Sequence, residues 1–117
     1  MTERYGWKIV FHDTIRHQLE TLHDAVSRTD HLTHEGRYLD PNVQLWCAVS
    51  QLMLKTIPEN PMLPEYSRGV PASGPWQYWR RVIFGERFAL FFRFHVEPNL
   101  IIYALITDTQ SKVVKTS

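Results

Sequence analysis

Apolar residues recur at helical spacing in the N-terminal half of the chain, after one short apolar run. The run covers residues 7–11 (WKIVF) and predicts a first β-strand. A stripe at intervals of four, three and four residues follows, as expected for one face of a helix. Its members are Ile15, Leu19, Leu22 and Val26. Asp13 stands where an N-cap carboxylate would accept the free N–H groups of the first turn. A polar connection is predicted over residues 27–39.

A second helix has clearer end signals. Asp40 is the predicted N-cap and Pro41 the first helical residue, where a missing N–H costs nothing. The predicted apolar face consists of Leu45, Ala48, Val49, Leu52 and Ile57. Pro58 is expected to end the helix, and residues 58–75 hold five prolines and two glycines. This composition predicts a long irregular loop, and such loops are often functional.

The remaining apolar pattern alternates and predicts three strands, over residues 79–84, 87–96 and 100–106. In the middle strand, the predicted core face holds Phe88, Leu90, Phe92, Phe94 and Val96. The opposite face holds Arg87, Ala89, Phe91, Arg93 and His95. We therefore predict one α+β domain over residues 1–117, in the order β-α-α-β-β-β, with two helices packed on one face of a small antiparallel sheet.

Composition narrows the class of protein. The chain has 117 residues, 44% of them hydrophobic and 21% charged, which is ordinary for a globular domain. Cys47 is the single cysteine, so an internal disulfide is excluded, and its apolar neighbours predict a core thiol. No apolar run has the length of a membrane span or a signal peptide. We expect a cytoplasmic protein.

Charge changes the picture more than composition does. Residues 76–96 carry four arginines, Arg80, Arg81, Arg87 and Arg93, against Glu86 alone. Arginine binds phosphate through two parallel hydrogen bonds and stacks on bases. Together with aromatic side chains, these arginines could hold an RNA backbone. The alternative is that these arginines lie on an exposed strand face and form ion pairs with acidic residues of the helices. For RNA binding we consider Arg80, Phe91, Tyr66 and Arg68.

Other chemistry has weaker support. Five histidines precede residue 35, but their spacing matches no metal motif, so we expect no metal and no cofactor. The sequence contains no nucleophile elbow, phosphate-binding loop or dinucleotide fingerprint. His95 shares the face of Arg93 and is chemically suited to proton transfer.

The C-terminal strands resemble the YhaV toxins of bacterial type II toxin–antitoxin systems, within the RelE/ParE superfamily. The resemblance rests on residues 79–85 (WRRVIFG), on Arg87-Phe88 and on residues 90–94 (LFFRF). It extends to Gly6-Trp7 and to Ile101 through Ala104.

This resemblance implies a RelE-like fold and a metal-independent endoribonuclease that cuts mRNA, usually on the ribosome. It also implies a PrlF-type antitoxin, through which alone the toxin would reach operator DNA. Arg81, Arg87 and Arg93 match basic positions of the family and are expected to converge on the scissile phosphate. Tyr103 is a candidate for proton transfer or stacking, or else a tyrosine packed in the sheet.

Two departures from the family predict that activity is impaired. Ala89 stands where the family has an arginine, and the chain has fewer residues after Asp108 than the family does. Two alternatives therefore stay open: a non-catalytic module that binds antitoxin or inhibits DNA gyrase as ParE does, and a generic RNA-binding domain.

Overall fold

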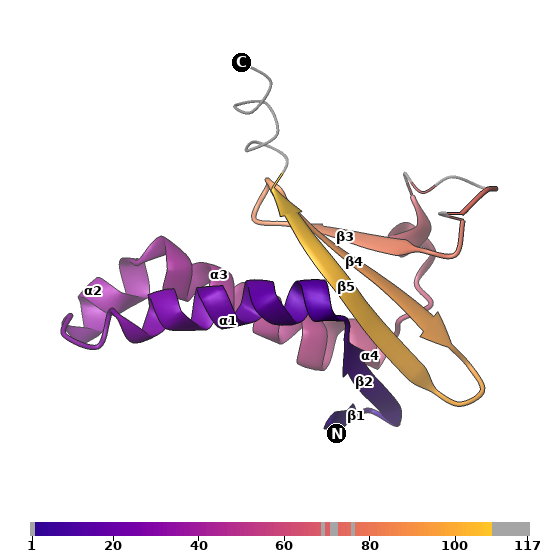
Figure 1. Cartoon of the computed structure of the whole chain (residues 1–117), viewed down its shortest axis with the longest axis horizontal. Helices are drawn as coiled ribbons and strands as arrows, with labels where there is room; N and C mark the ends of the chain where they lie inside the picture. Colours follow the sequence, from indigo (N-terminus) through magenta and orange to yellow (C-terminus); the bar gives the residue numbers. More distant parts are fainter. Residues whose placement is uncertain (1, 69, 71–72, 76, 109–117) are drawn as a thin grey trace, which may run out of the picture.

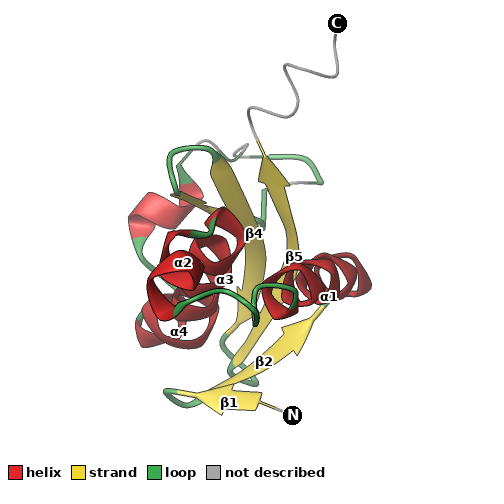
Figure 2. Cartoon of the chain, turned by 90° about the vertical axis from the view of Figure 1, so that its left-hand side faces the viewer, coloured by secondary structure: helices red, strands yellow, loops and turns green. Residues whose placement is uncertain are grey.

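The computed structural model describes residues 2–68, 70, 73–75 and 77–108. The helices lie together on one side of a twisted sheet and extend beyond it (Figures 1 and 2). The strands are β1 (Thr2–Arg4), β2 (Trp7–Phe11), β3 (Arg80–Phe84), β4 (Phe88–His95) and β5 (Leu100–Asp108). The α-helices are α1 (Asp13–Ser27), α2 (His34–Leu39), α3 (Pro41–Gln51) and α4 (Ile57–Glu59). A π-helical turn spans Leu52–Thr56, and a 3-10 turn spans Pro64–Ser67.

The sheet is mixed, which corrects the prediction of an antiparallel one. Its order is β1-β2-β5-β4-β3, and β2 pairs with β5 in parallel while the other neighbours are antiparallel. Strand β1 was not predicted, because its three residues carry no apolar alternation; Tyr5 and Gly6, both with positive φ, join it to β2. The α+β class is confirmed, and the arrangement is compatible with a RelE-like fold.

The helical stripe of α1 packs as predicted. Ile15 is fully buried, and Leu19 and Leu22 pack against the core. The N-cap lies one residue earlier than predicted: it is His12, and Asp13 is instead the first helical residue. The Asp13 carboxylate pairs with Arg16. Asp40, by contrast, caps α3 as predicted and accepts hydrogen bonds from the N–H groups of Asn42 and Val43.

Three smaller expectations are wrong. The predicted connection over 27–39 contains α2, which is capped by the Thr33 hydroxyl. Cys47 is exposed, because it lies on the opposite face of α3 from the fully buried Val49. Val96 is also exposed, because β4 ends at His95.

The end of the second helical segment is held by a residue of the sheet. The helix passes into the π-helical turn, in which the Ile57 N–H donates to the Leu52 carbonyl, five residues back. The next carbonyl, that of Met53, would need the N–H of Pro58, and proline has none. The hydroxyl of Tyr103 on β5 donates to this carbonyl instead, at 2.7 Å. The helix therefore continues one residue beyond Pro58, to Glu59, rather than ending there.

Beyond Tyr103, backbone groups of β5 are hydrogen-bonded by a side chain instead of a neighbouring strand. Strand β2 pairs with β5 only as far as Tyr103, so the next residues have no strand beside them on that side. The Gln18 side chain of α1 donates to the Ile106 carbonyl and accepts from the Ile106 N–H, both at 2.8 Å. The amide thus replaces a neighbouring strand and ties α1 to the sheet.

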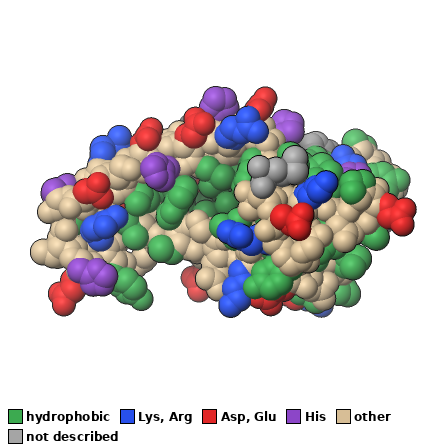
Figure 3. All heavy atoms as spheres, turned by 90° about the horizontal axis from the view of Figure 1, so that it is seen from below, with side chains coloured by type: hydrophobic (Ala, Val, Ile, Leu, Met, Phe, Trp, Pro, Cys, Tyr) green, Lys and Arg blue, Asp and Glu red, His purple; other side chains and the backbone are tan. Residues whose placement is uncertain are grey.

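Charges of both signs are mixed on one face of the helical end. On the face seen in Figure 3, acidic, basic and histidine side chains alternate over the end that projects beyond the sheet. In the described part of the chain, no helix is long and apolar enough to cross a membrane. Arg80, Arg81 and Arg93, by contrast, lie on the sheet, in β3 and β4.

Candidate active site

Alternation along β4 assigns its side chains to two faces, as predicted. Leu90 and Phe92 are fully buried under the helices, and Phe94 packs against the same core. The opposite face, which we call the outer face, carries Arg87, Ala89, Phe91, Arg93 and His95. Arg81 of β3 lies directly across from Phe91 and so belongs to the outer face as well.

The three arginines expected to converge are held in different places. Arg87 makes a two-pronged ion pair with Asp108: Nε donates to Oδ1 at 3.0 Å, and Nη2 donates to Oδ2. This hydrogen bonding raises the pKa of the Arg87 guanidinium. Arg87 lies in the turn just before β4 and Arg93 near the end of that strand, about 20 Å away. Sharing a face therefore did not bring them to one phosphate.

Arg81 lines a hollow of about 260 Å³ at the edge of β3, together with Arg68, Glu65 and Tyr66. Its guanidinium donates to the Arg68 carbonyl at 3.4 Å. Two arginines expected to bind RNA thus meet here, although a carboxylate shares the hollow.

A second hollow, of about 330 Å³, gathers Arg80 and Arg93 with His95, Tyr78 and Phe94. It lies where β3 begins and β4 ends. Arg80 donates to the carbonyls of Gln77 and Trp79, at 3.3 and 3.0 Å, and its guanidinium lies over the Phe94 ring. The Arg93 guanidinium lies over the Trp79 ring, 5.4 Å from its centroid. Within the described residues, neither arginine forms an ion pair with a carboxylate.

This second hollow, which we call the arginine–histidine hollow, is the best candidate for phosphate chemistry. It combines two cations held by carbonyls and rings with a solvent-exposed imidazole. The sequence placed His95 on the face of Arg93 but gave no sign that Arg80 and Tyr78 would join them. The signal that was missed is the hairpin register: Arg80 lies opposite Phe92, so Trp79 and Tyr78 reach the end of β4.

The two tyrosines named for the site are core residues. Tyr103 is fully buried, packs against Phe92 and Phe11, and donates its hydroxyl to Met53. Burial raises the pKa of Tyr103 strongly. Tyr66 is 6% exposed and meets Phe92 edge to face, and burial, with a smaller effect of Glu65, raises its pKa. Their packing supports the reading of Tyr103 as a tyrosine held within the sheet.

Phe91 lies in a third hollow, on the outer face. Ala89, at the position where the family carries arginine, is only 2% exposed and lies between Ile83 and Thr107 of the neighbouring strands. Trp76, an aromatic side chain close in sequence to these arginines, and the segment after Asp108 lie outside the described residues. The five N-terminal histidines are exposed, and among described residues no group of three or more His, Cys, Asp or Glu side chains could hold a metal ion.

Comparison with known proteins agrees with the resemblance. A family model for YhaV toxins, described as toxins with endonuclease activity of a toxin–antitoxin system, matches residues 9–117. Neither the curated proteins nor the solved structures give a significant match.

Proposed function

The chain belongs to the YhaV family of toxins with endonuclease activity, and from this premise we propose that it cleaves mRNA without a metal ion at the arginine–histidine hollow. The observation that carries the proposal is the meeting of Arg80, Arg93 and His95 in one hollow. An endonuclease must stabilise the charge that develops on a phosphate and must move protons. These three side chains can supply both functions.

The proposed reaction uses the nucleophile that RNA itself contains. His95 accepts the proton of the ribose 2′-OH, and the 2′-oxygen forms a bond to the adjacent phosphorus. The bond from phosphorus to the 5′-oxygen breaks, and that oxygen takes a proton from water, to which the hollow is open. The products are a 2′,3′-cyclic phosphate and a 5′-hydroxyl.

The cations act where negative charge grows. Arg80 and Arg93 are oriented before substrate arrives, Arg80 by two backbone carbonyls and Arg93 by the Trp79 ring. Such preorganised donors stabilise the transition state without further reorientation. Tyr78 is 62% exposed at the rim, where a base can stack on its ring.

The test is primer extension on mRNA, with and without ribosomes, in a buffer that contains a chelator. One mRNA carries a single 2′-deoxy nucleotide at the cleavage site, and a matched mRNA is all ribose. We expect cleavage of the ribose form only, with a cyclic phosphate identified by mass spectrometry. Equal cleavage of the 2′-deoxy form would contradict the proposed nucleophile.

Matched variants locate the site. His95→Gln is expected to lower the cleavage rate by about 10²-fold or more, because general base catalysis contributes about 10²–10⁴. His31→Gln, an exposed histidine of the helical end, is its control and should cleave normally. Arg93→Gln should likewise cost about 10²-fold, whereas exposed Arg28→Gln should have no effect. Loss of activity in both members of a pair would assign the effect to something other than the hollow.

A family of toxin–antitoxin systems implies an antitoxin partner. We propose that this antitoxin is of the PrlF type, that it connects the toxin to operator DNA, and that cleavage takes place on cytoplasmic ribosomes. Growth arrest on induction of the chain, relieved by co-expression of the antitoxin, is the expected phenotype. Inhibition of gyrase supercoiling without RNA cleavage would favour the non-catalytic alternative.

Reduced activity is proposed for the native chain because Ala89 supplies no cation. Ala89→Arg adds a guanidinium to the outer face at the other end of β4 from His95, where it can hold a neighbouring phosphate of the same RNA, so it should raise cleavage about tenfold at low salt through tighter RNA binding. Ala89→Met, of similar length and uncharged, is the control for filling this buried position. Equal rates for both variants and the native chain would remove the argument for impairment.

A further inference from the structure

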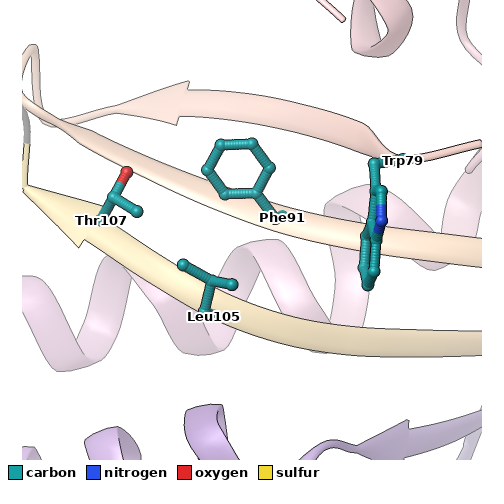
Figure 4. Close-up of a pocket in the computed structure, with 4 residues that line it drawn as sticks. All are labelled: Trp79, Phe91, Leu105 and Thr107. Carbon is teal, nitrogen blue, oxygen red and sulfur yellow. The ribbon is translucent and has the colours of Figure 1, made fainter. Parts of the chain in front are cut away.

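The outer face of the sheet contains an apolar hollow of about 290 Å³. Trp79 stands at one end and Thr107 at the other, with Phe91 and Leu105 between them, and the helices lie behind the sheet (Figure 4). The surface that these side chains present to the hollow is entirely apolar. We call this feature the outer groove.

A break in the regular pairing of β5 forms the floor of the outer groove. Phe91 pairs with Leu105, but the next residue, Phe92, pairs with Tyr103, so Ala104 is an extra residue in β5. Tyr103 and Ile106 pack on the core side, and Leu105 and Thr107 line the groove on the other. The strand therefore exposes apolar side chains on a face that none of the described helices covers (Figure 4).

Cations border this apolar floor on two sides. Arg81 is directly across from Phe91 in the register, and its guanidinium turns to the Arg68 carbonyl at the edge of β3. Arg93 lies two residues along β4, with its guanidinium over Trp79. Neither arginine is paired with a carboxylate within the part of the chain that the structure describes. An apolar centre with a cationic border is complementary to a segment whose apolar side chains are flanked by Asp or Glu.

We propose that the outer groove is the docking site of the antitoxin, and that it receives an apolar side chain from an acidic segment of that protein. The inference deepens the proposed function and rests on its antitoxin partner. The apolar side chain fills the space between Trp79, Phe91 and Leu105. Flanking carboxylates pair with Arg81 and Arg93.

The chemistry of the groove favours a protein segment over a nucleobase. A base inserted here can stack, but the lining offers its polar edge only the Thr107 hydroxyl and the Trp79 indole N–H, at opposite ends of the groove (Figure 4), so other polar atoms of the base stay without a protein partner. An aliphatic or aromatic side chain leaves no polar group unpaired. A second copy of the chain is less complementary, because it would bring its own arginines to the same border.

Docking in this position would also neutralise the toxin. Arg93 borders the outer groove through Trp79 and lines the arginine–histidine hollow with His95. A carboxylate bound to Arg93 occupies the cation that the scissile phosphate needs. The antitoxin then competes with RNA for one guanidinium.

The experiment measures the affinity of purified cognate antitoxin for the full toxin chain by calorimetry. Leu105→Asp should weaken binding by about 30-fold or more, as for a central interface residue. Leu39→Asp is the matched control, because Leu39 is 70% exposed on α2, away from the sheet. It should change the affinity less than twofold. Circular dichroism of both variants reports on folding.

A measurement on the native chain removes dependence on the folding of the variant. Nuclear Overhauser contacts between the Leu105 methyl groups and isotope-labelled antitoxin are expected in the complex. Their absence, or unchanged antitoxin affinity in folded Leu105→Asp, would overturn the docking site. Leu105→Asp that weakens RNA binding alone would assign the groove to a base, and loss of a toxin dimer alone would assign it to a second copy; either result overturns the proposal.

Cleavage of mRNA is assayed on the same proteins to separate the two proposals. If no protein cleaves mRNA but Leu105→Asp still loses antitoxin, the nuclease mechanism fails and the docking site stands. If mRNA is cut normally and both Leu→Asp variants bind antitoxin as the native chain does, the docking site fails and the nuclease stands.

Discussion

At the scale of single residues, buried hydroxyls and ion pairs decide which side chains remain available for chemistry. Tyr103 compensates for the missing N–H of Pro58 by donating to the Met53 carbonyl. Sequence reasoning could not see this, because the two residues are 50 positions apart and the need arises only once the π-helical turn forms. A tyrosine on a strand gives no sign of which helix carbonyl it will meet.

Tyr103→Phe is therefore expected to destabilise the fold. The buried Met53 carbonyl loses its donor, which should lower the free energy of unfolding by about 1–3 kcal/mol near neutral pH. Because burial raises the pKa of Tyr103, its contribution is fully present below the unfolded pKa of about 10 and is lost as the pH rises above it. Urea titrations from neutral pH to about pH 11 should show a steeper alkaline loss in the native chain than in the variant. Parallel curves would contradict this assignment.

Arg87 is a second case in which a residue named for catalysis is held by the fold. Arg87→Gln and Asp108→Asn should each lower the melting temperature, and the double variant should melt close to either single variant, because the pair is lost only once. Neither single variant should slow RNA cleavage by more than about twofold. Cleavage lost in Arg87→Gln but kept in Asp108→Asn would restore Arg87 to a phosphate-binding role.

At the scale of elements, local patterns identified most helices and strands but not their partners. Alternation in β4 gave its two faces, and Asp40-Pro41 gave the start of α3. Residues 100–106 are continuously apolar, so no alternation could reveal the break at Ala104 or the side to which Leu105 turns. The parallel pairing of β2 with β5 joins segments about 90 residues apart, which no local pattern encodes.

Gln18 shows how a helix completes the sheet. Gln18→Ala leaves the N–H and carbonyl of Ile106 without this partner, and should lower the free energy of unfolding by about 1–3 kcal/mol for two hydrogen bonds. Gln51→Ala, an exposed glutamine at the end of α3, should stay within about 0.5 kcal/mol. Hydrogen exchange should quicken at the Ile106 amide in Gln18→Ala only. Unchanged protection there would show that the hydrogen bonds from the Gln18 side chain to Ile106 contribute nothing to stability.

At the scale of the whole molecule, the formal net charge of +1 does not reveal how unevenly the charges are distributed. Mixed charges cover the helical end, whereas arginines without carboxylate partners among the described residues gather on the sheet. Sequence analysis found this concentration of arginine but not its separation into an ion pair and two hollows. Side-chain direction depends on neighbours such as Trp79 and Asp108, which only the folded chain brings into place.

The salt dependence of RNA binding counts the cations in use. Each phosphate contact to a single strand contributes about −0.7 to the slope of log K against log salt. Two contacts, from Arg80 and Arg93, predict a slope of about −1.4 in the native chain and about −0.7 in Arg93→Gln. Filter binding of a short oligoribonucleotide over a range of KCl concentrations gives both slopes. The same slope in both proteins would exclude Arg93 as a phosphate contact.

The Arg93 guanidinium stacked on Trp79 has a genetic consequence. A toxin variant that escapes its antitoxin through a substitution at position 93 would lose nuclease activity as well, because the substitution removes the guanidinium that binds the phosphodiester. Selection for escape should therefore recover changes at Leu105 or Phe91 and spare Arg93. Because Arg93 serves both RNA cleavage and antitoxin binding, toxin and antitoxin are expected to coevolve at this contact.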